Sequence, residues 1–136
     1  EHTPFYKYPF ILAQLIDVNV ATVFRLQKMR RRADVLVFER SPWDTLADVI
    51  LDTGCDALTQ NFFGHGITAQ IRDRGKVIWV SRSQPAILST RPSMKHDRKL
   101  ARKIEIYERL ARIYGWKVLD NDRSLETVKE ELWRLL

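Results

Sequence analysis

The sequence Ala33-Asp34-Val35-Leu36-Val37-Phe38-Glu39-Arg40-Ser41-Pro42-Trp43-Asp44 joins a short apolar run to a carboxylate, a guanidinium and a hydroxyl group. A continuous apolar run such as Val35–Phe38 is typical of a parallel strand that is buried on both faces. In open α/β sheets, ligands bind just beyond the carboxyl ends of the strands. Glu39 and Arg40 therefore follow a strand at the place where such a fold puts its chemistry. The same pattern also fits an ordinary strand followed by a helix cap and an exposed ion pair.

Composition limits the class of protein. The 136 residues are enough for one domain with a core and too few for two ordinary domains. Hydrophobic residues make up 45% of the chain and charged residues 29%, which is the mix of a soluble globular protein. We see no apolar run long enough to span a bilayer and no signal peptide, so we expect a cytoplasmic protein without a membrane partner.

The single cysteine and the charge balance limit the chemistry further. Cys55 stands alone, which excludes an internal disulfide and a metal site of several cysteines and fits a reducing cytoplasm. We interpret it as a small packed hydrophobe rather than a nucleophile. The net charge of +6 favours anionic partners, meaning nucleotides, nucleic acid or acidic surfaces, and does not choose among them.

The order of helical and strand patterns predicts an α/β fold of three layers. Strands separated by helices imply right-handed crossovers and a parallel sheet with helices on both faces. Ser41 and Pro42 begin one helix and Gly54 ends it, while Gly115 and Ser124 cap two later helices. The predicted strands are Val35–Phe38, Lys76–Val80 and Trp116–Leu119; the predicted helices are 10–32, 42–53, 56–74, 85–90, 99–114 and 125–136. We expect a single domain over residues 1–136, with a basic, mobile lid near residues 85–103.

Three polar clusters would meet if the strand ends share one edge of the sheet. They are Glu39-Arg40, Ser81-Arg82-Ser83, and the loop 91–98 with Arg102 and Lys103 one turn further on. Guanidinium groups beside a carboxylate suit phosphoryl transfer, in which catalysis consists largely of positioning and electrostatic stabilisation. Glu39 would then help to hold Mg²⁺ or its waters. The alternative for the basic loop is a solvated run of charges.

Other site types find no support in the sequence. The three histidines, His2, His65 and His96, have no ligand spacing among them, so a histidine metal site is not expected. Neither a Ser-His-Asp nor a Gly-x-Ser-x-Gly arrangement is present, and the five glycines form no Gly-x-x-x-x-Gly-Lys-Ser/Thr phosphate loop.

The order of the motifs resembles the thymidylate kinase-like branch of the P-loop nucleotide and nucleoside kinases. Glu39-Arg40-Ser41, followed by Asp44 and Ala47, is similar to the Asp-Arg-Tyr-x-x-Ser-x-x-Ala segment of that family and to the Glu-Arg-Ser of deoxynucleoside kinases. The resemblance runs from the first helix to the last. Its remaining parts are Arg25, Val77–Val80, Pro85, Leu88-Ser89-Thr90-Arg91, Asp97-Arg98, Tyr107-x-x-Leu110-Ala111, Val118, Asp120, Ser124, Glu126 and Val128.

This resemblance implies a nucleotide kinase that uses ATP and Mg²⁺ and binds nucleotide substrates. It gives catalytic roles to four residues. Arg40 would hold the acceptor phosphate or sugar, Glu39 would act near the attacking oxygen and, through a Mg²⁺-bound water, near the metal, and Arg91 and Arg98 would close over the donor phosphates. The acceptor site would be made of Arg25, Arg40, Ser41, Trp43 and Asp44. A homodimer is left open.

The sequence departs from the family at three places. Asp48-Val49 replaces the family's Tyr-Gln, so thymine selectivity is not implied, and Ser81 replaces the acidic residue after the second strand. The family's N-terminal strand, phosphate loop, helix and next strand are absent, and a unit of this kind takes roughly 30 residues or more. We therefore expect this chain to be the C-terminal part of a longer kinase, or its fold to close the gap between Val35–Phe38 and Val77–Val80 differently.

Two further functions stay open beside transfer to a nucleoside monophosphate. A deoxynucleoside kinase is favoured by Glu39-Arg40-Ser41. A non-catalytic module that binds nucleotides or nucleic acid through residues 28–32 and 91–103 is the second, and we rank it lower because no aromatic residues interleave these cations.

Overall fold

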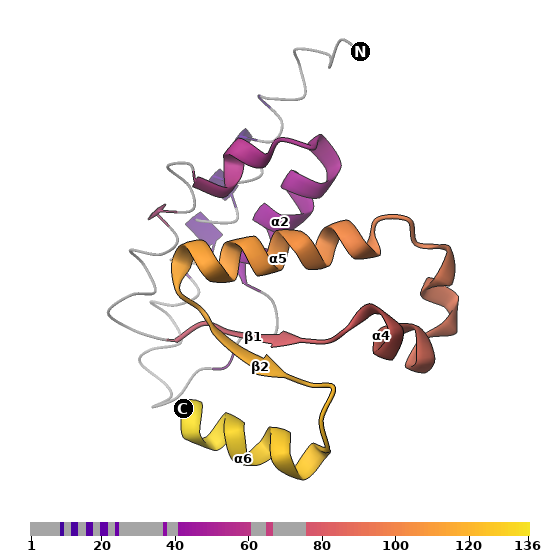
Figure 1. Ribbon diagram of the computed structural model, residues 1–136. Coiled ribbons are helices and arrows are strands. Elements are labelled where there is room, and N and C mark those ends of the chain that lie inside the picture. The colour runs from indigo at the N-terminus through magenta and orange to yellow at the C-terminus, as the bar shows by residue number, and fades with distance from the viewer. Residues whose placement is uncertain are drawn as a thin grey trace. The chain divides into compact units, whose positions relative to one another are not determined.

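The chain divides into two compact units, Glu1–Gln70 and Ile71–Leu136, which are described separately. Figure 1 shows the elements in a computed structural model of the chain. The structure describes Pro9, Leu12, Ala13, Ile16, Asp17, Val20, Ala21, Phe24, Val37 and residues 41–60, 65–66 and 76–136. The prediction of one domain over residues 1–136 stays a prediction.

The first unit contains helix α2, Pro42–Thr53, which begins and ends as its sequence predicts. Pro42 occupies the first turn, where the missing N–H of proline costs nothing. Asp44 closes the start of the helix, because its Oδ2 accepts hydrogen bonds from the Ser41 backbone N–H at 2.7 Å and from Ser41 Oγ at 3.1 Å. Gly54 ends the helix at φ +67°, a left-handed conformation that glycine adopts without strain.

The region that follows α2 differs from its prediction. A helix was expected over Asp56–Arg74, but Asp56–Gln60 form a 3₁₀ helix, η1. The tighter turn is held by contacts to the third residue back, from Thr59 Oγ1 to the Asp56 carbonyl at 2.7 Å and from the Leu58 N–H to the Cys55 carbonyl at 3.1 Å. His65 and Gly66 are helical, and the rest of the predicted helix lies outside the described residues.

For two other predicted elements of the first unit, the structure describes only some of the residues. The described residues of the predicted helix 10–32, from Leu12 to Phe24, are all helical. Of the predicted strand Val35–Phe38 only Val37 is described; it belongs to no strand and its side chain is 88% exposed, so a buried strand is not what the structure shows at this residue.

The second unit is built on two parallel strands, β1 (Ile78–Ser81) and β2 (Lys117–Asp120). The register pairs Ile78 with Lys117 and Ser81 with Asp120, so both strands end at the same edge. The two predicted strands are therefore confirmed, each starting one or two residues later than expected.

The connection between the strands is a crossover of three helical segments. Helix α4 (Gln84–Thr90) leads into a 3₁₀ helix, η2 (Pro92–His96), and then into helix α5 (Leu100–Tyr114). Gly115 ends α5 at φ +64°, as predicted. Helix α6 (Leu125–Leu135) follows β2, and Ser124 Oγ accepts a hydrogen bond from the Thr127 N–H, the predicted cap.

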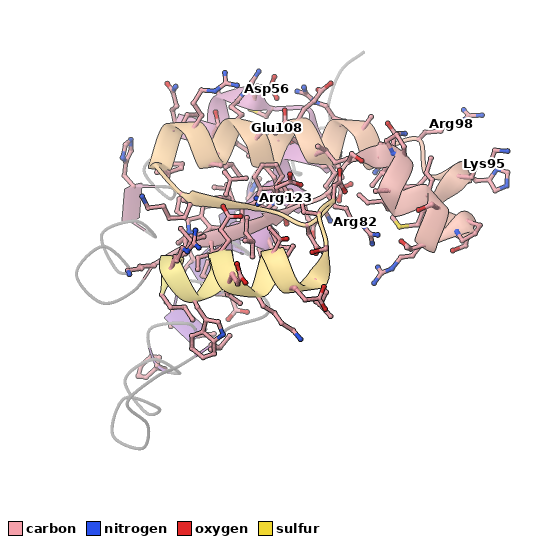
Figure 2. The ribbon with its side chains drawn as sticks, turned by 60° about the horizontal axis from the view of Figure 1, so that its bottom comes forward. Asp56, Arg82, Lys95, Arg98, Glu108 and Arg123 are labelled. Atoms are coloured by element: carbon pink, nitrogen blue, oxygen red, sulfur yellow. The ribbon has the colours of Figure 1, made fainter. Side chains whose placement is uncertain are left out.

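Helices α5 and α6 flank the strand pair on opposite sides (Figures 1 and 2). The indole of Trp79 stacks on the ring of Tyr107 in α5, with ring centres 6.2 Å apart and planes 11° from parallel. Because side chains alternate along a strand, Ile78 and Val80 point toward the other side, where α6 packs against β2. Leu119 is fully buried on that strand.

The described part of the chain is mostly helical with a small parallel sheet, which fits the α/β class. Among the residues that the structure describes, we find no helix with the length and apolar content needed to cross a membrane. The larger three-layer sheet of a P-loop kinase stays a prediction.

Candidate functional site

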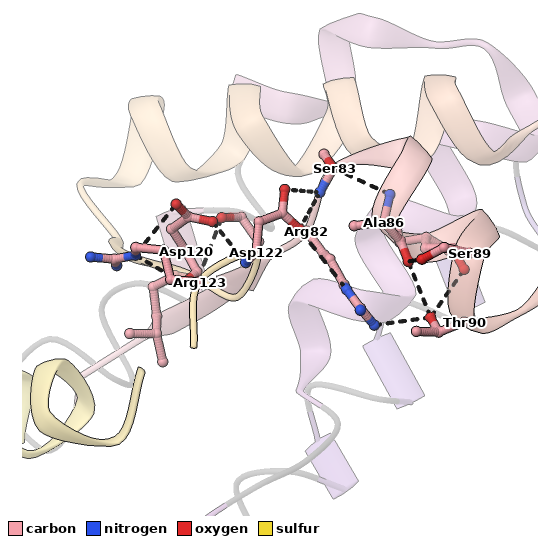
Figure 3. Close-up of polar contacts among 11 residues, drawn as sticks. Arg82, Ser83, Ala86, Ser89, Thr90, Asp120, Asp122 and Arg123 are labelled. Atoms are coloured by element: carbon pink, nitrogen blue, oxygen red, sulfur yellow. Dashed lines mark hydrogen bonds and ion pairs between the residues drawn. The ribbon is translucent and has the colours of Figure 1, made fainter. Parts of the chain in front are cut away.

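The carboxyl ends of β1 and β2 bring two polar loops together. The Ser83 backbone N–H donates to both carboxylate oxygens of Asp122, at 3.2 Å and 3.1 Å, and the Asn121 N–H donates to the Ser81 carbonyl at 2.9 Å (Figure 3). These contacts join residues that are 39 or 40 positions apart in the sequence. The loop after β2 is thereby fastened to the start of α4.

Arg82 runs along α4 from the end of β1 to the end of that helix (Figure 3). Its Nη1 donates to Thr90 Oγ1 at 3.0 Å, and its Nε lies 3.9 Å from Asp122 Oδ1. The side chain is 34% exposed, but Nε itself is buried and has no hydrogen-bond partner. Arg82 thus ends beside Thr90, the residue that precedes Arg91.

Arg123 follows β2 and has its charge balanced by two carboxylates. Its Nε lies 3.5 Å from Asp120 Oδ2, and its Nη2 forms an ion pair with Glu131 of α6. Asp120 Oδ1 also accepts a hydrogen bond from the Asp122 N–H at 3.0 Å. Arg123 is therefore a structural link between β2 and α6.

The segment 91–103 concentrates positive charge. It holds six Lys and Arg side chains against one carboxylate, Asp97, a net charge of +5, while the whole chain carries +6. Asp97 Oδ1 accepts a hydrogen bond from the Lys99 N–H at 2.9 Å. Arg91, Lys95 and Arg98 are exposed and make no side-chain hydrogen bond or ion pair in the part of the chain that the structure describes. Figure 2 shows Lys95 and Arg98 pointing outward at one end of the second unit.

The predicted convergence of the three clusters stays a prediction. Arg82 contacts Thr90, the last residue of α4 and the residue before the basic loop 91–98. Glu39 and Arg40, which form the third cluster, lie outside the described residues, as does Arg25.

The acceptor-side residues that the structure describes lie at the start of α2. Ser41 and Asp44 are engaged with each other in the helix cap. Trp43 is 2% exposed, so its ring is buried. Substrate contacts for Ser41, Trp43 and Asp44 stay predictions.

Candidate metal ligands do not cluster among the residues that the structure describes. Within the described ranges, no group of three or more His, Cys, Asp or Glu side chains has the arrangement of a metal site. Asp120 and Asp122, the carboxylates at the strand edge, are held by Arg123 and by the Ser83 N–H, so they do not fit a Mg²⁺ site. Glu39, to which the resemblance gives that role, is not described.

Sequence reasoning missed the parts played by Thr90 and Asp122. Asp122 has no predicted role, and Thr90 ends a predicted helix and belongs to the segment Leu88-Ser89-Thr90-Arg91 of the family resemblance. A signal for Asp122 does exist in the sequence, because a polar loop after each of two parallel strands must reach the same edge of the sheet. The partner that each side chain chooses depends on the register, which the sequence does not show.

Comparison of the chain with family models, with curated proteins and with solved structures gives no match. The functional interpretation therefore depends on the residues and their contacts.

Proposed function

We propose that this chain is part of a thymidylate kinase-like nucleotide kinase that transfers the γ-phosphoryl group of ATP to a nucleoside monophosphate. One observation carries the proposal: β1, which ends at a common carboxyl edge with β2, is followed through α4 by the segment 91–103 of net charge +5. The carboxyl edge of parallel strands is where open α/β folds bind ligands. An excess of cations in the connection that follows that edge suits a ligand with several phosphate groups.

The chemistry of phosphoryl transfer explains why exposed arginines would be needed. The group in transit carries charge on several oxygens, and positioned cations stabilise that charge. Arg91 and Arg98 are exposed and have no carboxylate partner in the described part of the chain, so their guanidinium groups are available to the donor phosphates. Arg40 and Arg25 would bind the acceptor nucleotide, and Glu39 would act next to the attacking oxygen.

The proposal includes ATP and Mg²⁺, a three-layer P-loop fold and a cytoplasmic location. Mg²⁺, when bound, neutralises charge on the donor phosphates and organises them. The proposal assigns the metal to Glu39 through a bound water, as the family resemblance implies. Nucleotides are the proposed partners, and a homodimer is left open.

A steady-state assay of ADP formation tests the proposal on the complete product of the gene, with ATP, Mg²⁺ and nucleoside monophosphates. Arg98→Ala is expected to lower kcat/KM about 10²-fold, because removing one donor to a developing charge has an effect of that order. Arg112→Ala is the matched control, since Arg112 is an exposed arginine in the last turn of α5. The control should stay within about twofold of the native protein.

Two results contradict the proposal in different ways. Unchanged turnover in Arg40→Ala means that Arg40 does not bind the acceptor, and equal losses in Arg98→Ala and Arg112→Ala mean that the basic segment has no specific role.

The alternative functions give other patterns in the same experiments. A deoxynucleoside kinase phosphorylates thymidine faster than its monophosphate. A binding module shows no turnover, and its affinity for nucleic acid falls log-linearly with salt concentration. The segment 91–103 is the feature that favours this second possibility.

A further inference from the structure

Arg82 and Arg123 each follow the carboxyl end of a strand, but the surroundings balance their charges differently. Arg123 pairs with Asp120 and with Glu131. Arg82 has one carboxylate near it, Asp122, and that oxygen is 3.9 Å from Nε, too far for a hydrogen bond. Both oxygens of Asp122 already accept from the Ser83 N–H, so the carboxylate is only partly available to Arg82.

The Nε atom of Arg82 is buried and lacks a hydrogen-bond partner. A buried donor of this kind costs free energy, and in native proteins it is usually explained by a bound water or ion, or by a functional role. The other end of the guanidinium is held, because Nη1 donates to Thr90 Oγ1, and Thr90 Oγ1 in turn lies 3.1 Å from the Ile87 carbonyl. The orientation of the group is thus set before any ligand arrives.

A second cation, Arg91, follows the residue that Arg82 contacts. Thr90 is followed directly by Arg91, which is exposed and has no ion-pair partner among the described residues. The Arg82 guanidinium contacts the Thr90 hydroxyl group, and Arg91 is the next residue in the sequence. Guanidinium groups bind phosphate through paired, charge-assisted hydrogen bonds.

We propose that Arg82, with Arg91, binds a phosphate group of a small-molecule ligand beside Thr90, at the end of α4. Arg82 is new to the site, because the family resemblance gives it no role. The role of Arg91 rests on the proposed function, whereas that of Arg82 rests on its contacts alone.

A competing account gives Arg82 a structural role only. Its positive charge lies at the carboxyl end of α4, where a cation stabilises a helix. Its contact with Thr90 also links the end of β1 to that helix. Binding and stability must therefore be measured on the same variants.

The test is calorimetric titration of the full chain with pyrophosphate at low ionic strength, without metal. Arg82→Gln removes the charge together with the Nη1 contact to Thr90, because the shorter amide ends at about the position of Nε. We expect its affinity for pyrophosphate to fall about tenfold, the size of one charge-assisted contact that is partly open to solvent. Arg123→Gln is the matched control, because it removes an arginine from the same strand edge whose charge is already balanced. Its affinity should change less than about twofold.

A second variant keeps the test decisive if Arg82→Gln does not fold. Arg82→Lys retains the charge without the planar group and should bind pyrophosphate more weakly than the native chain at an unchanged melting temperature. The proposal is overturned if native chain and Arg82→Gln bind equally, if Arg82→Gln and Arg123→Gln lose the same affinity, or if the native chain does not bind pyrophosphate. Binding that depends on Arg82, in a gene product that transfers no phosphoryl group, upholds this site and refutes the proposed function.

Discussion

Gly115 and Gly66 show how one glycine can be required by the backbone while another is not. Gly115 ends α5 at φ +64°, and a Cβ built on it meets no atom within 4 Å, so only backbone strain opposes a side chain there. Gly66 is helical and its Cβ position is also open. The two positions therefore separate conformational strain from steric clash.

Gly115→Ala is expected to lower the free energy of unfolding by about 1 kcal/mol, because alanine is strained in the left-handed region. Gly66→Ala should leave it unchanged or raise it by up to about 1 kcal/mol, since alanine favours a helix. Urea denaturation of both variants measures the difference. Equal effects at the two positions would contradict the assignment of Gly115 as a helix end.

Tyr114, next to Gly115, gives a pH-dependent prediction. Burial raises the pKa of Tyr114 above its usual value of 10.0. The folded state then holds the phenol proton more tightly than the unfolded state, so this group's contribution to stability is present below pH 10 and is lost as the pH rises above it. Melting curves at pH 8 and pH 11 should show a smaller alkaline loss in Tyr114→Phe than in the native chain; an equal loss would contradict this.

At the scale of elements, local signals in the sequence predicted where helices begin and end. The structure has the predicted helix caps at Ser41, Gly54, Gly115 and Ser124, with Pro42 in the first turn of α2. These residues could be predicted because each acts on backbone groups within its own turn. The contact between Ser83 and Asp122 was not predictable in the same way, since it depends on the register of β1 and β2. The α-helix predicted to begin at Asp56 is an example of a local prediction that was wrong. The Thr59 hydroxyl donates to the Asp56 carbonyl and favours a 3₁₀ turn there.

Helix α6 has a cap that no local signal indicates. Lys76, which precedes β1, donates from Nζ to the main-chain oxygens of Leu135 at 3.0 Å and Leu136 at 2.6 Å. Leu135 is the last residue of α6, and a cation is favourable at the carbonyl end of a helix. The contact links the segment before β1 to the end of α6.

Lys76→Met should destabilise the chain by about 0.5–1 kcal/mol, the usual contribution of a cation at an exposed helix end. Lys129→Met is the control, because Lys129 is exposed on the same helix and makes no hydrogen bond in the described part of the chain. Thermal denaturation at low and high salt measures both. A loss that does not shrink at high salt, or that Lys129→Met shares, would contradict the cap.

At the scale of the whole molecule, the residues named in the proposed function are divided between the two units of the chain. Arg91 and Arg98, the proposed donor-side residues, and Arg82 belong to the second unit, whose structure is described throughout residues 76–136. Those of the acceptor side belong to the first unit, and Glu39, Arg40 and Arg25 lie outside the described residues. The sequence predicted the two parallel strands of the second unit, while the donor and acceptor roles both depend on the family resemblance.

The most direct measurement follows a labelled phosphate from ATP to its acceptor. The complete gene product is incubated with ATP labelled in the γ-phosphate, Mg²⁺ and a mixture of nucleoside monophosphates, and the products are separated by chromatography. The account predicts label in a nucleoside diphosphate, and about 10²-fold less of it with Arg98→Ala than with Arg112→Ala. Label that stays in ATP, or that appears only as inorganic phosphate whichever acceptor is present, would contradict the account.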